Sequence, residues 1–172
     1  MSLLLLTGCK NLEGSVDRAL GFREQLLNSN GCSFDALVTA DYTDVQYTFN
    51  IHCEADAQGA ISFQVLSPET IAGIAGTISE DGGRFTFDGE TLLFPLLIEG
   101  VVSPVSAPWL FLEGLQSGYI SGCAQTDQEI EIHIDDTYEG HNLKFIVKAD
   151  SSACPVFADI FWNGQRILSL NI

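Results

Sequence analysis

The sequence predicts an α+β fold that is mainly antiparallel β. Apolar residues recur at helical spacing near the N-terminus, over residues 11–28, and from Cys32 onwards they alternate strictly with polar residues. The alternating runs that follow are short and are separated by turn residues, so consecutive runs are expected to join as hairpins. The 172 residues suffice for one domain with a single core.

The N-terminal segment, residues 11–28, has the pattern of an amphipathic helix. Its apolar stripe consists of Leu12, Val16, Ala19, Leu20, Leu26 and Leu27. Ser15 can cap the start of the helix, and the polar residues 28–31 provide a stop signal. We expect this helix to pack one face against the sheet.

The first hairpin is predicted from residues 32–42 and 45–53, which alternate with period two on either side of a short turn. One register places every apolar partner on the same face, and it pairs Ala40 with Tyr47, Val38 with Phe49 and Phe34 with Cys53. Pattern and register therefore both predict the hairpin.

Further runs with period two follow along the chain. They cover residues 61–65, 74–79, 84–87, 129–135, 143–148, 156–162 and 166–172. Asn163-Gly164 between the last two is a two-residue hairpin signal. Residues 90–122 fit neither period, and their Leu, Phe and Pro content predicts short helices or loops that cover the sheet. Together, the runs with period two indicate about eight or nine strands in an antiparallel meander.

The charge balance excludes one class of partner. The chain has 23 Asp and Glu against 7 Lys and Arg, for a formal net charge of -16. Proteins that bind nucleic acid place cations against phosphates, so we expect no nucleic-acid partner. The apolar residues 91–112 contain Pro95, Pro104 and Pro108, which would break a membrane-spanning helix.

The first nine residues end in Leu6-Thr7-Gly8-Cys9. An apolar run that ends in small residues before a Cys resembles the end of a bacterial lipoprotein signal peptide. The resemblance implies cleavage before Cys9 and lipid on that residue, which leaves residues 1–8 as a signal-peptide remnant and residues 9–172 as a single domain. No cation precedes the run and it is short, so we expect the true start to lie upstream. The alternative is an ordinary buried segment that ends in Cys.

A lipidated Cys9 would hold the protein to a bacterial membrane on its extracytoplasmic side, since each buried acyl methylene contributes about 0.8 kcal/mol. In an exported chain, the four remaining cysteines could form disulfides or stay buried as free thiols. They are Cys32, Cys53, Cys123 and Cys154. The predicted register puts Cys32 and Cys53 on one face but diagonal, about 7 Å apart, which is long for a bridge.

No motif points to catalysis, and we expect no enzyme activity, no catalytic residues and no cofactor. His52 and Cys53 are neighbours on a strand, so their side chains point to opposite faces and cannot act as a base and nucleophile pair. Residues 133–141 are rich in His, Asp and Glu, but their spacing matches no metal motif, and we expect no metal.

The order of elements resembles that of the bacterial lipoprotein carrier and receptor superfamily, which serves outer-membrane sorting and includes related lipid-binding envelope lipoproteins. The matching pieces are residues 11–28, 34–42, 63–68, 87–92 and 107–112. The resemblance implies an incomplete, half-open antiparallel barrel with an N-terminal helix and a mid-chain helical lid. The carrier has an Arg immediately before the Pro of the 63–68 segment, where this sequence has Ser67.

The candidate ligand-binding residues are the large apolar side chains of the predicted inner face and lid. They are Tyr47, Phe49, Ile51, Phe63, Val65, Phe85, Phe87, Trp109 and Phe111. Under the resemblance they line a cavity, and otherwise they are core. We therefore expect a lipid-anchored envelope lipoprotein that binds, and could transfer, a hydrophobic small molecule or lipid. The alternative is a protein-interaction or sensor lipoprotein with a filled core and an acidic face for an envelope protein.

Overall fold

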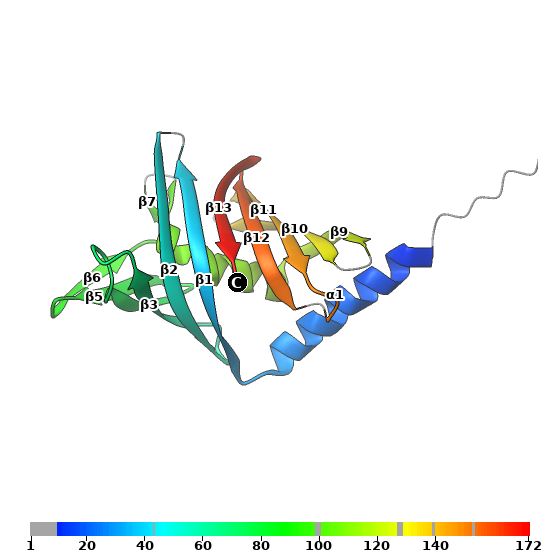
Figure 1. The fold of residues 1–172 in the computed structure, drawn as a ribbon, viewed down its shortest axis with the longest axis horizontal. Helices are drawn as coiled ribbons and strands as arrows, with labels where there is room; N and C mark the ends of the chain where they lie inside the picture. The colour runs from blue at the N-terminus through cyan, green and yellow to red at the C-terminus, as the bar shows by residue number, and fades with distance from the viewer. Residues whose placement is uncertain (1–9, 43, 99–100, 127–128, 139, 153) are drawn as a thin grey trace, which may run out of the picture.

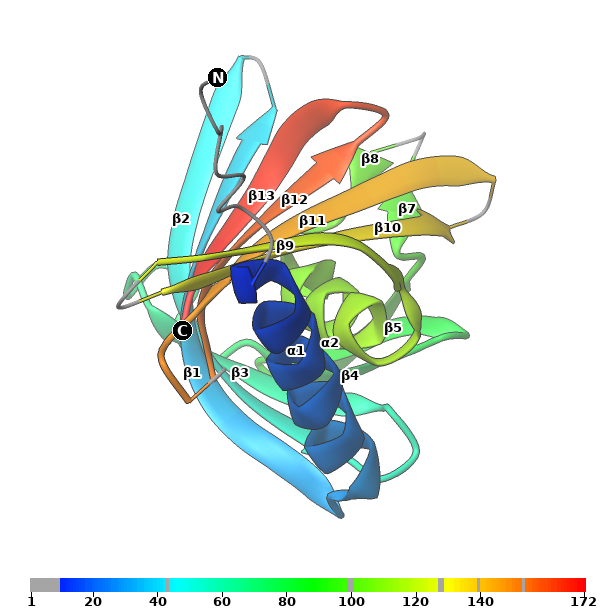
Figure 2. The ribbon, with the colours of Figure 1, turned by 90° about the vertical axis from the view of Figure 1, so that its right-hand side faces the viewer.

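The computed structural model describes residues 10–42, 44–98, 101–126, 129–138, 140–152 and 154–172. Cys9 and residues 1–8, which are predicted to be a signal-peptide remnant, lie outside this described part. The described chain forms one large curved sheet, a two-stranded ribbon, two α-helices and one 3₁₀ turn. Figure 2 shows helix α2 inside the curve of the sheet and helix α1 crossing in front of it.

The elements follow one another in a simple order. They are α1 (Lys10–Asn28), β1 (Gly31–Tyr42), β2 (Val45–Asp56), β3 (Ile61–Ser67), β4 (Ala75–Ser79), β5 (Gly82–Phe87), β6 (Glu90–Phe94), β7 (Leu97–Ile98), β8 (Val101–Val102), η1 (Pro104–Ser106), α2 (Ala107–Ser117), β9 (Tyr119–Gln125), β10 (Ile130–Tyr138), β11 (His141–Ala149), β12 (Pro155–Trp162) and β13 (Gln165–Asn171).

The large sheet has eleven strands in the order β6-β5-β4-β3-β2-β1-β13-β12-β11-β10-β9 (Figure 1). Each of its pairs is antiparallel. Strands β6 and β9 form its two edges and do not pair with each other, so the barrel stays open. The predicted half-open antiparallel barrel with an N-terminal and a mid-chain helix is therefore confirmed.

The β1–β2 hairpin has the predicted register. Its pairs include Ala40 with Tyr47, Val38 with Phe49 and Phe34 with Cys53. Along β1, Ala36, Val38 and Ala40 are buried, and the residues between them are more exposed. The inner face of the hairpin thus contributes to the core, as the alternation predicted.

On the outer face of this hairpin, His52 Nδ1 lies 2.6 Å from Asp35 Oδ1. The hydrogen bond to Asp35 raises the pKa of His52 above its ordinary value. Because the pKa is higher in the folded state, this contact stabilises the fold fully below about pH 6.5 and its contribution is lost as the pH rises through the folded-state pKa. We expect an NMR titration to give a lower His52 pKa in Asp35→Asn than in the wild type. The same pKa in both proteins would contradict the contact.

Helix α1 packs along a narrower stripe than predicted. Ala19 is buried, and Phe22 and Leu26 pack against the core, but Leu20 and Leu27 are 47% and 58% exposed. The helix packs against the sheet at its edge strand β9, and it also contacts α2. A narrow stripe of apolar residues suffices for these contacts. The prediction that Leu20 and Leu27 belong to the buried stripe was therefore wrong.

The segment at residues 90–122 is more regular than predicted. It holds the edge strand β6, the β7–β8 ribbon, η1, α2 and most of β9. Leu92 and Leu93 on β6 are 57% and 76% exposed. Because this edge strand has apolar residues on both of its faces, its sequence lacks the alternation of apolar and polar residues by which a strand is predicted. Pro104 is the first residue of η1 and Pro108 the second of α2, where a missing N–H group costs nothing.

Helix α2 fills part of the concave face of the sheet. Eight of its eleven residues are buried. A Cβ atom on Gly114 would lie 2.7 Å from the ring of Phe145, and one on Gly118 would overlap Ile134. These two glycines let the end of α2 touch β10 and β11 closely, so this part of the concave face is packed core.

Candidate functional site

An apolar pocket of about 280 Å³ opens where α1, α2, the start of β1 and the start of β12 meet. We call it the apolar pocket. Its large side chains are Phe22, Leu26, Phe34, Phe111, Leu112, Leu115 and Ile172. The remaining lining residues are small or uncharged, and no Asp, Glu, Lys, Arg or His side chain is among them.

Aromatic packing fixes one wall of this pocket. The rings of Phe34 on β1 and Phe111 on α2 meet edge to face, with their centroids 6.4 Å apart and their planes at 71°. Phe111 is buried and Phe34 is half-buried. This arrangement suits the charge distribution of two aromatic rings and holds the sheet and helix sides of the pocket together.

Arg23 ties the two helices together beside the pocket. Its Nε donates to the carbonyl oxygen of Leu115, in the last turn of α2, at 2.5 Å. A cation is favoured at the C-terminal end of a helix, where the carbonyl groups carry partial negative charge. Burial lowers the pKa of the Arg23 guanidinium. This bond links α1 to α2, and Phe22 and Leu115, from the same two helices, both line the apolar pocket.

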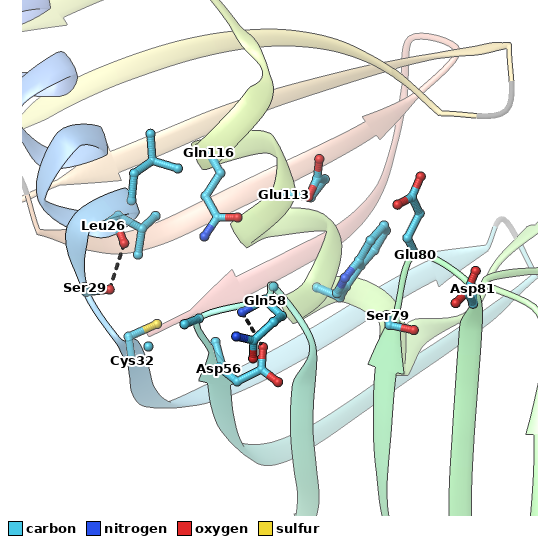
Figure 3. A pocket seen from close by; sticks show the side chains of 16 residues that line it. Leu26, Ser29, Cys32, Asp56, Gln58, Ser79, Glu80, Asp81, Glu113 and Gln116 are labelled. Atoms are coloured by element: carbon cyan, nitrogen blue, oxygen red, sulfur yellow. Dashed lines mark hydrogen bonds between the residues drawn. The ribbon is translucent and has the colours of Figure 1, made fainter.

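A polar pocket of about 380 Å³ adjoins the apolar pocket. The two share Leu26, Ser29, Gly31 and Cys32. Its other side is acidic, and the carboxylates that line it belong to Asp56, Glu80, Asp81 and Glu113. Figure 3 shows Leu26 and Cys32 at one end of this pocket and Glu80 and Asp81 at the other.

A third, smaller pocket of about 230 Å³ continues along α2. It shares Glu80, Trp109 and Glu113 with the polar pocket and adds Asp136 and Tyr138. The rings of Trp109 and Tyr138 meet edge to face at 5.9 Å. We call the polar pocket and this pocket together the acidic trough. Among the residues described as lining it, none is Lys, Arg or His.

The residues predicted to line a cavity are spread over several environments. Trp109 lines the acidic trough, and Phe111 lines the apolar pocket. Four belong to the buried core, namely Phe49, Ile51, Phe63 and Val65. Phe85 is half-buried against Phe94, while Tyr47 and Phe87 are 50% and 47% exposed. None of these seven lines the three pockets described here, and their role in ligand binding stays a prediction.

Sequence reasoning missed most of the apolar pocket. Phe22, Phe34, Leu115 and Ile172 were not proposed as ligand residues, although each lines it. They come from α1, β1, α2 and the end of the chain, and no local pattern shows that these segments meet. Leu26, at the end of the predicted apolar stripe of the helix, was the one lining residue from α1 that the sequence pattern had marked as apolar and inward-facing.

Burial holds the thiols of Cys32 and Cys53 in their protonated form. The described cysteines, Cys32, Cys53, Cys123 and Cys154, are free. Burial raises the pKa of Cys53 to about 12 and also raises that of Cys32, so both thiols are held in the protonated form. Within the described ranges, no group of three or more His, Cys, Asp or Glu side chains lies where it could hold a metal ion.

No helix in the described part of the chain has both the length and the apolar character to cross a membrane. No protein-family model and no curated protein matches the sequence.

Solved structures resemble the chain in fold. A putative outer membrane lipoprotein-sorting protein domain from Vibrio parahaemolyticus aligns with a TM-score of 0.51 and 11% identity, over 91% of this chain and 75% of that one. A LolA superfamily protein from Nitrosomonas europaea aligns with a TM-score of 0.46 and 10% identity, over 92% and 75%. A chain from the complex of the CwlD amidase with the GerS lipoprotein of Clostridioides difficile aligns with a TM-score of 0.44 and 13% identity, over 100% and 96%. The chain thus has the half-open barrel fold of the lipoprotein-sorting domain, and at the level of the fold the resemblance seen in the order of its elements is confirmed.

Proposed function

We propose that this protein is a lipid-anchored lipoprotein of the bacterial envelope that binds a hydrophobic or lipid-like ligand without catalysing a reaction. The observation that carries this proposal is the apolar pocket, where none of the described lining residues has a charged side chain. The fold and the Leu6-Thr7-Gly8-Cys9 sequence support the envelope location and the anchor.

Binding would be driven by removing apolar surface from water, at about 25 cal/mol for each Å² buried. The pocket volume of about 280 Å³ lies near the lower end of small-molecule sites, which run from about 300 to 1,000 Å³. The apolar pocket therefore suits a single chain or ring system. The core residues Phe49, Ile51, Phe63 and Val65 would join the site only for a larger ligand that opens the core.

The test of this function uses Cys32, which lines both the apolar and the polar pocket and is half-buried. In Cys32→Trp the indole would fill the space that the two pockets share. We expect its affinity for the neutral probe 1-N-phenylnaphthylamine, measured by fluorescence, to fall at least tenfold, which corresponds to about 1.4 kcal/mol. Cys32→Ser keeps the volume and is expected to bind like the wild type.

Circular dichroism should show that both variants keep the sheet, since Cys32 is not part of the fully buried core. Equal affinity in Cys32→Trp and the wild type would refute this pocket as the site. A wild-type protein that takes up no apolar probe would refute ligand binding itself. The function would then be the alternative one, an interaction lipoprotein that meets a protein partner through its acidic surface.

A further inference from the structure

The acidic trough continues directly from the apolar pocket. Leu26, Ser29 and Cys32 are among the residues that line both the apolar and the polar pocket. Glu80 and Glu113 then belong to both parts of the trough. A molecule whose apolar part occupies the apolar pocket therefore has its other end beside carboxylates.

The charge of the trough is of one sign. Glu80 and Asp81 are exposed, and Glu113 and Asp136 are half-buried. No Lys, Arg or His is described among the lining residues of the apolar pocket or the trough. An anionic head group in this place would be repelled, and a cationic one attracted, most strongly at low ionic strength.

The carboxylates keep free capacity for a ligand. Glu113 Oε1 accepts a hydrogen bond from Ser117 Oγ at 2.9 Å, and a carboxylate has about four acceptor positions. Asp56 is different, because its Oδ1 accepts from the backbone N–H groups of Gln58 and Ala60 and so holds the β2–β3 turn. Glu80 and Glu113, which approach from the β4–β5 turn and from α2, are the better placed pair (Figure 3).

An aromatic side chain adds a second feature that suits a cation. Trp109, which is 4% exposed, lines both parts of the trough, as Glu80 and Glu113 do, and its ring is held against Tyr138. Ammonium groups are attracted to the faces of aromatic rings, Trp being the strongest of them. Carboxylates beside an indole, with an apolar pocket adjoining, form a site with a charged end and an apolar end.

We infer that the ligand is an amphiphile with a positively charged head group, its chain in the apolar pocket and its head in the acidic trough. This inference rests on the proposed function. It separates the protein from carriers of fatty acids or other anionic lipids, whose head groups would meet only like charges.

The test compares three probes with the same dodecyl chain below their micelle concentrations. They are dodecyltrimethylammonium, dodecyl maltoside and dodecyl sulfate. Calorimetric titration is expected to give the order cationic, neutral, anionic, with about tenfold between the first two at low salt and a smaller ratio at high salt.

The variant Glu80→Gln/Glu113→Gln is expected to lower the affinity for the cationic probe about tenfold and to leave that for the neutral probe unchanged. Glu24→Gln is the matched control, because Glu24 is exposed on α1 and lines neither pocket. If the double variant unfolds at a lower temperature, the exposed Glu80→Gln alone serves, with a smaller loss expected.

The possible results distinguish a failure of the cationic head group from a failure of hydrophobic ligand binding. A neutral probe that binds as well as the cationic one, or a double variant with unchanged cation affinity, overturns the cationic head group and leaves hydrophobic binding in place. A chain that binds none of the three probes overturns both.

Discussion

Replacing Phe49 by arginine is expected to unfold this protein. Phe49 is 5% exposed and belongs to the core cluster, and its β1 partner Val38 is fully buried. Removing a buried Phe side chain costs about 3–5 kcal/mol, and an unpaired buried charge adds to that. Because a domain is stable by only about 5–15 kcal/mol, we expect circular dichroism to show a protein that is unfolded or close to it at room temperature.

Tyr47→Arg is the matched control. Tyr47 lies two residues before Phe49 on the same face of β2, but it is 50% exposed. A surface change of this kind alters stability by about 0.5 kcal/mol or less, so we expect urea unfolding like that of the wild type. A Phe49→Arg protein that stays folded would contradict the packed core here and would favour the cavity that the sequence also allowed.

The same glycine-to-alanine change is expected to have opposite effects in the two helices. In Gly114→Ala the new methyl group would meet the ring of Phe145 at 2.7 Å, and Phe145 is itself only 1% exposed and cannot move aside. Overpacking of this kind costs about 1–3 kcal/mol, which exceeds the helix-propensity gain of about 1 kcal/mol. In Gly21→Ala nothing lies within 4 Å of the new atom, so the variant gains helix propensity without a packing cost and is expected to be more stable than the wild type.

Calorimetry is the measurement for this pair. In a domain of this size a change of 1 kcal/mol shifts Tm by about 2–4 °C, so we expect Gly114→Ala to melt below the wild type and Gly21→Ala above it. If both variants melt above the wild type, the contact between α2 and β11 is looser than described, and the concave face holds free space at Phe145.

The parts of the fold that follow from local patterns could be predicted from the sequence. The β1–β2 register follows from alternation across a short turn, and the last hairpin follows from Asn163 and Gly164, which take φ values of 48° and 86°. Both signals involve residues close together in the chain. The amphipathic helix and the apolar middle segment were recognised for the same reason.

Burial within a predicted strand could not be read from alternation alone. Tyr47 and Phe49 share one face of β2, yet one is exposed and the other buried. The pairing of β2 with β3 ends at Asn50 and Ser67, so Tyr47 extends beyond the width of the sheet on that side. Where a neighbouring strand ends depends on the next turn along the chain, which the residues of β2 do not encode.

The candidate site was harder to predict than the fold because its walls come from distant segments. The apolar pocket joins Phe22 of α1 to Phe111 of α2 and to Ile172 at the end of the chain. No spacing or motif connects these positions. The aromatic residues that looked most like a ligand surface lie mainly in the core, where apolar residues on a sheet are usually found.

The place of β13 in the sheet determines when this protein can fold. This strand comes last in the sequence but pairs with both β1 and β12 in the middle of the sheet. Until β13 pairs with β1 and β12, the strands from β1 to β6 and those from β9 to β12 form two separate hairpin stacks, each with an open edge. Such edges are templates for aggregation, and pairing of residues far apart in the chain is slow. The sheet is therefore continuous only once β13 has paired with both neighbours, and a chaperone that shields β1 and β12 before then would act on the step that decides between folding and aggregation.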